Sequence, residues 1–207
     1  MRYELKYYLT EGDYDRFIAV VNEHPAGFVK NYPDRTVNNI YLDSPDLDSW
    51  HETQFGLSER KKYRIRWYGD WERMEQPALE IKVKQNQLGT KLVYPLRSLN
   101  WDSLSKDIDH IKADLSLPHH LMISSTNFYS RSYFESHCGI YRITIDKELN
   151  FGNGLYNLVK PEIPSRWGVM ELKYDLTDDQ DSDWVKQFIP FQRSKFSKYV
   201  NALYLTR

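Results

Sequence analysis

The sequence predicts an α+β fold built on an antiparallel sheet, and three observations support this class. Segments that alternate apolar and polar residues recur along the chain, as half-buried strands do. Helical segments lie between them without a regular β-α-β order. Tyrosine is abundant, with 16 among 207 residues, and aromatic residues favour strands. The expected strands lie near residues 2–9, 36–43, 60–68, 79–84, 90–97, 127–134, 139–147 and 168–175.

Five helical segments are expected between and after these strands. The first is "TEGDYDRFIAVVNEHP", residues 10–25, with Thr10 as a cap and an apolar stripe typical of a helix that covers a core. The second is "SPDLDSWHETQF", residues 44–55, with Ser44 as its cap and Pro45 in its first turn. Weaker helical patterns follow at 101–115, 182–188 and 194–205.

The length allows one large domain with a substantial core or two small ones, and we expect a single domain spanning 1–207. The composition, 41% hydrophobic and 28% charged residues, is ordinary for a soluble globular protein. A formal net charge of −1 excludes a basic nucleic-acid binder as a whole, so a positive site must be a local concentration of charge. The one cysteine, Cys138, excludes an intramolecular disulfide and a CxxC zinc site. We expect a cytoplasmic protein, because no apolar run approaches the ~20 residues of a membrane span.

Charged residues repeat on one face of several expected strands. In "KKYRIRWYG", residues 61–69, Lys62, Arg64 and Arg66 share one face, and Tyr63, Ile65 and Trp67 share the other. Same-face neighbours of like charge repel each other unless water or an anion compensates. The same design occurs in "RYELKYYL", "LEIKVK", "YSRSYF", "YRITID" and "VMELKYD".

Two explanations fit these faces. The charges could simply be solvated, since a half-buried antiparallel sheet has a polar outer face. However, the faces carry many cations and few acids, and closing eight strands into a barrel would turn them inward. A barrel lined with lysine and arginine repels itself when empty and is stabilised by a polyanion. The sequence therefore predicts bound phosphates, several in a row.

An ordered set of motifs along essentially the whole chain resembles the VTC domain, the polyphosphate polymerase domain among the triphosphate tunnel metalloenzymes related to CYTH proteins. The motifs are "RYELKYYL", "NNIYLDSPDL", "RKKYRIRWYG", "LEIKVK" followed by Lys91, "YSRSYF", "YRITID", "VMELKYD" and "RSKFSKYVNALY".

This resemblance implies a closed eight-stranded antiparallel tunnel with flanking helices, which binds ATP or triphosphate and needs a divalent metal ion, Mn²⁺ or Mg²⁺. It implies Glu171 as the metal ligand and places Tyr129 near the nucleotide end. The implied phosphate-binding residues are Lys6, Arg64, Arg66, Lys82, Lys91, Arg131, Arg142, Lys195, Ser197 and Lys198. Those implied in catalysis are Lys6, Arg64, Arg66 and Lys198.

The first strand departs from the wider tunnel family, which often begins with ExExK. Arg2 stands at the first carboxylate position, and Glu4 and Lys6 remain. Glu4 is therefore equally well explained as a metal ligand or as a salt-bridge partner of a lining cation. The phosphate-sensing module and membrane segment of the eukaryotic assemblies find no place in these 207 residues, so vacuolar translocation is not expected.

The last helix allows two further interpretations. If Ser194 caps it, Lys195, Ser197 and Lys198 lie in its first turn, where free N–H groups favour an anion. Alternatively the helix is amphipathic and packs Phe196, Val200 and Leu203 into the core. Both can hold, since the two sets use opposite faces.

The expected function is an enzyme that transfers the ATP γ-phosphoryl group to a growing polyphosphate chain. The alternatives are a tripolyphosphatase or nucleoside triphosphatase of the same fold, and a non-catalytic polyphosphate-binding or RNA-binding module. RNA would need an open basic face with exposed aromatics, so the expected partners are ATP, triphosphate or polyphosphate. Neither a nucleic acid nor a membrane is expected as a partner, and the oligomeric state stays open.

Overall fold

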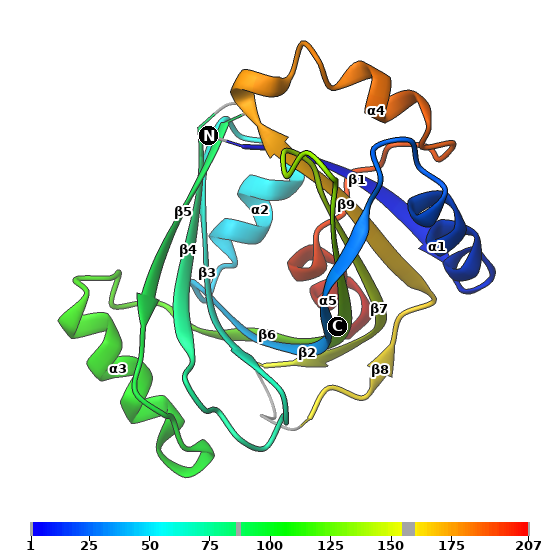
Figure 1. Ribbon diagram of the computed structural model, residues 1–207. Helices are drawn as coiled ribbons and strands as arrows, with labels where there is room; N and C mark the ends of the chain where they lie inside the picture. Colours follow the sequence, from blue (N-terminus) through cyan, green and yellow to red (C-terminus); the bar gives the residue numbers. More distant parts are fainter. Residues whose placement is uncertain (1, 86–87, 155–159, 207) are drawn as a thin grey trace. The chain divides into compact units, whose positions relative to one another are not determined.

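The computed structural model describes residues 2–85, 88–154 and 160–206 (Figure 1). The strands are β1 (Arg2–Thr10), β2 (Val29–Asp43), β3 (Glu59–Tyr68), β4 (Ala78–Gln85), β5 (Leu88–Pro95), β6 (Met122–Glu135), β7 (Arg142–Asn153), β8 (Ile163–Pro164) and β9 (Trp167–Asp175). The α-helices are α1 (Tyr14–Asn22), α2 (Asp48–Gln54), α3 (Leu104–Asp114), α4 (Asp183–Gln187) and α5 (Lys198–Thr206).

The strands follow the hydrogen-bonded order β1-β9-β7-β6-β2-β3-β4-β5, with β8 beside β7. The pairings of β1 with β9, β9 with β7, and β2 through β5 are antiparallel, which confirms the α+β class and the eight expected strands. Strand β2 begins at Val29 rather than near residue 36, and the short β8 was not anticipated. The expected closure is not seen among the described pairings, whose order ends at β1 and at β5.

The chain divides into two compact units, which we describe separately. Unit 1 comprises Met1–Arg35, Tyr129–Leu149 and Pro164–Ser197. Unit 2 comprises Thr36–Phe128, Asn150–Ile163 and Lys198–Arg207. The long strands β2, β6 and β7 supply residues to both units.

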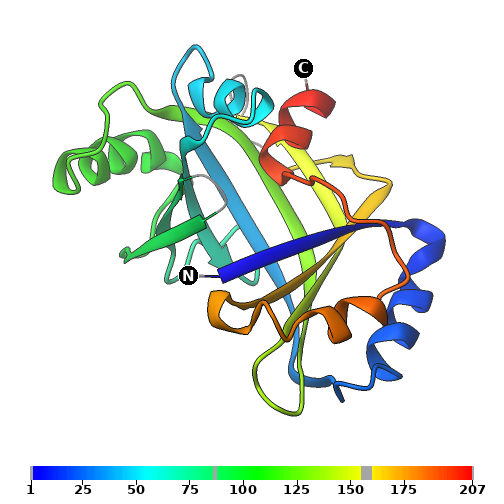
Figure 2. The ribbon, with the colours of Figure 1, turned by 90° about the horizontal axis from the view of Figure 1, so that it is seen from above.

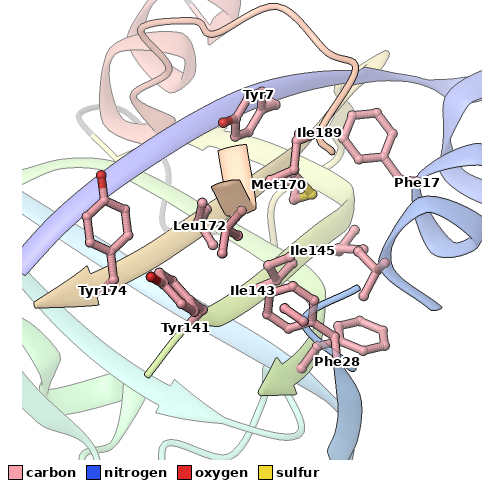
Figure 3. Close-up of a cluster of buried hydrophobic side chains, with 14 of the residues drawn as sticks. Tyr7, Phe17, Phe28, Tyr141, Ile143, Ile145, Met170, Leu172, Tyr174 and Ile189 are labelled. Atoms are coloured by element: carbon pink, nitrogen blue, oxygen red, sulfur yellow. The ribbon is translucent and has the colours of Figure 1, made fainter. Parts of the chain in front are cut away.

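The core of unit 1 lies between α1 and the apolar faces of β1, β7 and β9. Phe17 and Val21 of α1 are fully buried, as their helical spacing predicts. Figure 3 shows Phe17 with Met170, Ile145 and other members of this cluster. In Figure 2, α1 lies near the end of β1, where Thr10 N donates a hydrogen bond to Asp13 Oδ2 (3.1 Å). The apolar residues of these strands therefore face a helix, and their charged residues occupy the opposite face.

Helix α3 belongs to unit 2 (Figure 1). Its Leu104, Ile108 and Ile111 are buried with the apolar faces of β3 and β4 in the core of this unit. Trp67 of β3 is fully buried and lies 5.1 Å, between ring centroids, from Trp71. Burial of large apolar side chains is the main favourable term in folding. Because successive side chains of a strand point to opposite faces, burial of the apolar residues of β3 and β4 places their charged residues on the other face.

The start of α2 differs from the expectation based on Ser44 and Pro45. The helix begins at Asp48, three residues later than Pro45. The Ser44 hydroxyl accepts a hydrogen bond from the backbone N–H of Asp48 (3.0 Å), as expected of a cap. The buried carboxylate of Asp43 caps the same turn, because it accepts hydrogen bonds from the backbone N–H groups of Ser44 (2.8 Å), Ser49 (3.0 Å) and Trp50 (3.2 Å). It also accepts one from the hydroxyl of Tyr199 in α5. Asp43 therefore joins α2 to α5, which lie side by side in unit 2 (Figures 1 and 2).

The prediction that Ser194 caps the last helix was wrong, since α5 begins at Lys198. Ser194 N instead donates a hydrogen bond to Lys6 O (2.9 Å), and Arg193 forms an isolated β-bridge with Tyr7. Backbone pairing with β1 keeps this segment extended, so Lys195 and Ser197 precede the helix. The amphipathic interpretation is supported within α5 by Leu203, which is fully buried.

Candidate phosphate-binding site: two charged clusters

The charged face of β3, β4 and β5 in unit 2 brings like charges directly opposite one another. Lys62 lies opposite Lys82, and Lys82 lies opposite Lys91 on the next strand. Directly opposed like charges destabilise a sheet. In the described residues of these three strands, Glu80 is the one carboxylate on this face. The face therefore carries a strong excess of positive charge.

Glu80 lies at the centre of the unit 2 cluster, which we define as Arg64, Arg66, Glu80 and Lys91. Its Oε2 accepts hydrogen bonds from Nε and Nη2 of Arg64 at 2.7 and 2.5 Å, and its Oε1 accepts one from Lys91 Nζ at 3.0 Å. Arg66 Nη1 lies 3.6 Å from Oε2. Three cations thus share one carboxylate that is only 5% exposed.

Electrostatics keep Glu80 ionised. Burial alone would raise the pKa of this carboxyl group, but the charges of Arg64, Arg66 and Lys91 outweigh burial and hold the pKa far below its usual range. Glu80 therefore stays negatively charged at any working pH. The cations of the unit 2 cluster outnumber it, so the net charge of the cluster is positive.

A buried amide pair fixes the position of Arg66. Arg66 Nε donates a hydrogen bond to Asn39 Oδ1 (2.9 Å), and Asn39 Nδ2 donates one to Asn127 Oδ1 (2.9 Å). Both asparagines are fully buried, and the register places Asn39 opposite Arg66. The Asn39 amide, whose oxygen and nitrogen are both hydrogen-bonded, restricts the guanidinium to one orientation.

The unit 1 cluster surrounds Glu171 of β9, which is 4% exposed. Its carboxylate lies 3.2 Å from Lys6 Nζ and 2.7 Å from Lys173 Nζ. Arg131 Nη2 is 3.7 Å away, and the Thr144 hydroxyl donates a hydrogen bond at 3.4 Å. The register explains the convergence, since Lys6 and Thr144 lie opposite Glu171 on either side.

Glu4 lies at the margin of the unit 1 cluster. Its carboxylate is 4.0 Å from Lys6 Nζ and 3.9 Å from Lys173 Nζ. Of the two roles considered from the sequence, these contacts favour a salt-bridge partner of the lining cations. Lys6 Nζ also donates a hydrogen bond to Phe196 O (3.1 Å), so backbone and carboxylates together hold this ammonium group.

Arg131 forms a buried two-point ion pair with Asp146. Nε and Nη2 of Arg131 donate to the two carboxylate oxygens of Asp146 at 2.5 and 2.7 Å. Burial lowers the pKa of the Arg131 guanidinium, but the Asp146 carboxylate outweighs burial, so the pKa is raised above its usual value. The guanidinium also lies 5.2 Å from the centre of the Tyr129 ring. Tyr129 is 1% exposed, and its nucleotide contact stays a prediction.

The other predicted residues lie in different surroundings. Arg142 is exposed and pairs with Glu135 across the sheet (2.9 Å). Lys82 and Lys195 are exposed, and Lys198 is buried at the start of α5. Lys6 and Arg64 belong to different units, so the common cavity that the resemblance implies for them stays a prediction.

Several charged residues near the predicted cations and Glu171 were not predicted as site residues. Glu80, Lys62 and Lys173 were visible on the charged faces but were not selected as site residues. Their spacing could have identified them. Each lies an even number of residues from a predicted site residue on its strand, and so shares its face of the sheet. Asp146 gave the same signal, since it lies four residues from Arg142 on β7, but its pairing with Arg131 could not be recognised from one strand. Asn39 gave no such signal, because the pairing of β2 with β3 is needed to recognise it.

Comparison with known protein families shows the family of this chain. The model of the VTC domain matches residues 1–206. The chain belongs to the VTC domain family. The match covers both clusters of this VTC domain, whereas a comparison with curated protein sequences returns no match.

Solved structures with the same fold as this VTC domain share little of its sequence. A candidate adenylate cyclase from Vibrio parahaemolyticus aligns over 98% of this chain and 97% of its own, with 16% identity and a TM-score of 0.58. A protein from Pyrococcus horikoshii aligns over 99% of both chains, with 13% identity and a TM-score of 0.55. A candidate adenylyl cyclase from Hippeastrum, described as having a dominant triphosphatase activity, aligns over 100% of this chain and 97% of its own, with 10% identity and a TM-score of 0.54. These likenesses show the fold.

Membrane-spanning helices and metal-ligand clusters are both absent from the described residues. No helix there is both long enough and apolar enough to cross a bilayer. In the same residues, no group of three or more His, Cys, Asp or Glu side chains is arranged to hold a metal ion.

Proposed function

We propose that this VTC domain is a polyphosphate polymerase that transfers the γ-phosphoryl group of ATP to a growing polyphosphate chain and releases ADP. Membership of the VTC domain family over residues 1–206 carries the proposal, because the charged clusters alone would suit any polyanion. The opposed lysines Lys62, Lys82 and Lys91 support it, since a row of phosphates would relieve their repulsion.

The arginines are assigned to the phosphates. Phosphoryl transfer needs alignment and neutralisation of the phosphoryl oxygens more than covalent chemistry. Arg64 and Arg66 suit this because a guanidinium stays charged and binds phosphate through two N–H groups. Asn39 restricts Arg66 to one orientation before the substrate binds. Lys6 and Lys198 act as point charges in this proposal.

The residues around Glu171 fit a metal ion that arrives with its substrate. Lys6 and Lys173 lie within 3.2 Å of the Glu171 carboxylate, and their charges oppose a bare dication. Mg²⁺ and ions like it are often held by one or two carboxylates together with substrate phosphates, so Glu171 is the protein ligand we assign. The ion would neutralise charge on the phosphate oxygens.

The alternative is a triphosphate hydrolase of the same fold. The triphosphatase activity described for the Hippeastrum protein favours it. The two reactions differ in the attacking group, which is water in the hydrolase and a terminal phosphate in the polymerase. The same phosphate contacts serve both.

The test is the product formed from ATP and Mn²⁺. Long polyphosphate on a gel, with ADP release, is expected of the polymerase, whereas free phosphate without long chains would establish the hydrolase. Arg66→Lys should reduce turnover more than ATP binding, since a point charge cannot replace two-point contacts. Arg97→Lys is the matched control, because Arg97 is 79% exposed. Equal turnover in the two variants would place the reaction elsewhere.

A further inference from the structure

We propose that Glu80 is a counter-ion that lowers the affinity of the charged face of β3, β4 and β5 for phosphate. The geometry of the unit 2 cluster carries this proposal. This inference rests on the proposed function and adds to it a residue that sets affinity. Glu80 would hold Arg64, Arg66 and Lys91 in place while the site is empty, and would repel the phosphate that these cations bind.

The contacts suit a counter-ion better than a metal ligand. Both carboxylate oxygens of Glu80 are engaged by cations, Oε2 by Arg64 and Oε1 by Lys91. The same holds for Glu171, but there a second carboxylate, Glu4, lies beside the same lysines. The described residues of β3, β4 and β5 place no second carboxylate on this face that could share a dication. A hard divalent ion would have to displace these cations without the help of a neighbouring carboxylate.

A counter-ion would have two effects at this site: it would stabilise the empty face and would ease release of the bound polymer. Without Glu80, the described residues of β3, β4 and β5 would place five cations on this face with no carboxylate among them, which destabilises the folded state. These cations are Arg64, Arg66, Lys62, Lys82 and Lys91. A polymer that must advance as it grows also needs contacts weak enough to release it, as ions do in a channel. One fixed negative charge among the cations has both effects.

The proposal predicts a gain in affinity when a buried contact is removed. Glu80→Gln keeps the shape of the side chain and deletes its charge. In metal-free buffer, tripolyphosphate should bind about tenfold to thirtyfold more tightly, the change calculated for one phosphate charge about 8 to 12 Å from the lost carboxylate at an effective dielectric constant of about 20. A residue with a merely structural role would weaken binding when it is replaced.

The experiment is isothermal titration of the full chain with tripolyphosphate at low salt, with chelator present. Glu72→Gln is the matched control, because Glu72 is exposed in unit 2 and loses the same charge. Tighter binding by Glu80→Gln alone supports the counter-ion. Equal or weaker binding by Glu80→Gln overturns it and leaves the proposed function standing. If the wild type fails to bind tripolyphosphate, the proposed function fails and the counter-ion role fails with it.

A second variant covers the case in which Glu80→Gln does not fold. The double variant Arg64→Gln/Glu80→Gln removes one cation with the anion and so restores the net charge of the unit 2 cluster. It should fold and should bind tripolyphosphate no more tightly than the wild type. A double variant that also fails to fold would overturn the proposal, because the loss would then not come from unbalanced charge.

Discussion

Replacing Asp146 with asparagine should destabilise the protein far more than removing a surface carboxylate. Asp146 is fully buried and holds Arg131, whose side chain is 10% exposed, through two hydrogen bonds. Breaking a buried ion pair by removing one partner typically costs about 3–5 kcal/mol, since the remaining charge stays buried. Glu171, at 3.7 Å from Arg131, retains part of the compensation. We therefore expect a loss of about 3 kcal/mol, at the lower end of that range.

This loss converts into a measurable shift of the melting temperature. With an unfolding entropy of about 2.1 cal/mol/K per residue, a chain of 207 residues unfolds with about 0.4 kcal/mol/K. Asp146→Asn should therefore lower Tm by about 7 °C. Differential scanning calorimetry in a buffer without phosphate measures this directly.

The matched control is Glu135→Gln. Glu135 and Arg142 form the reverse pair between the same two strands, with the acid on β6 and the arginine on β7, and their side chains are 31% and 53% exposed. An exposed pair contributes about 0–1 kcal/mol, so Tm should fall by ~2 °C at most. Equal shifts in the two variants would refute the argument that burial, rather than pairing itself, sets the cost.

Three more predictions concern single side chains. Burial lowers the pKa of His24 despite the hydrogen bond to Val185 O, so the unfolded chain binds a proton more readily and stability should fall as the pH drops below about 6.5. In His24→Asn the slope of Tm against pH between 7 and 5 should be shallower, and an unchanged slope would rule His24 out. Asn39→Ala should lower the free energy of unfolding by about 2 kcal/mol in urea titrations, because Arg66 loses a buried acceptor; a loss below about 0.5 kcal/mol, as at ordinary surface sites, would contradict this. Tyr199→Phe should cost about 1–3 kcal/mol, since buried Asp43 loses a donor, and faster amide exchange in α5 should accompany it; unchanged exchange there would count against the link between α2 and α5.

The strands were predictable because a period of two is a local property of the backbone. The alternation in "KKYRIRWYG" separates Lys62, Arg64 and Arg66 from Tyr63 and Trp67 in any sheet, and the apolar set proved to be buried. The helix starts were less predictable. Ser44 accepts a hydrogen bond from Asp48 N, but the helix begins later than expected and the buried carboxylate of Asp43 also caps its first turn. Ser194 has the residue type of a cap, but backbone pairing with β1 keeps it outside α5.

The sequence by itself determined which side chains share a face, the excess of cations on those faces and, through its ordered motifs, the family. Only the tertiary structure decided which carboxylate holds which cation. Arg64 meets Glu80, and Lys6 meets Glu171, because strand register places them opposite each other. Register depends on residues far apart in the chain, and a slip of one position would turn every side chain to the other face. Asn39 and Asp146 became recognisable for the same reason, since a buried partner is defined by the strand beside it.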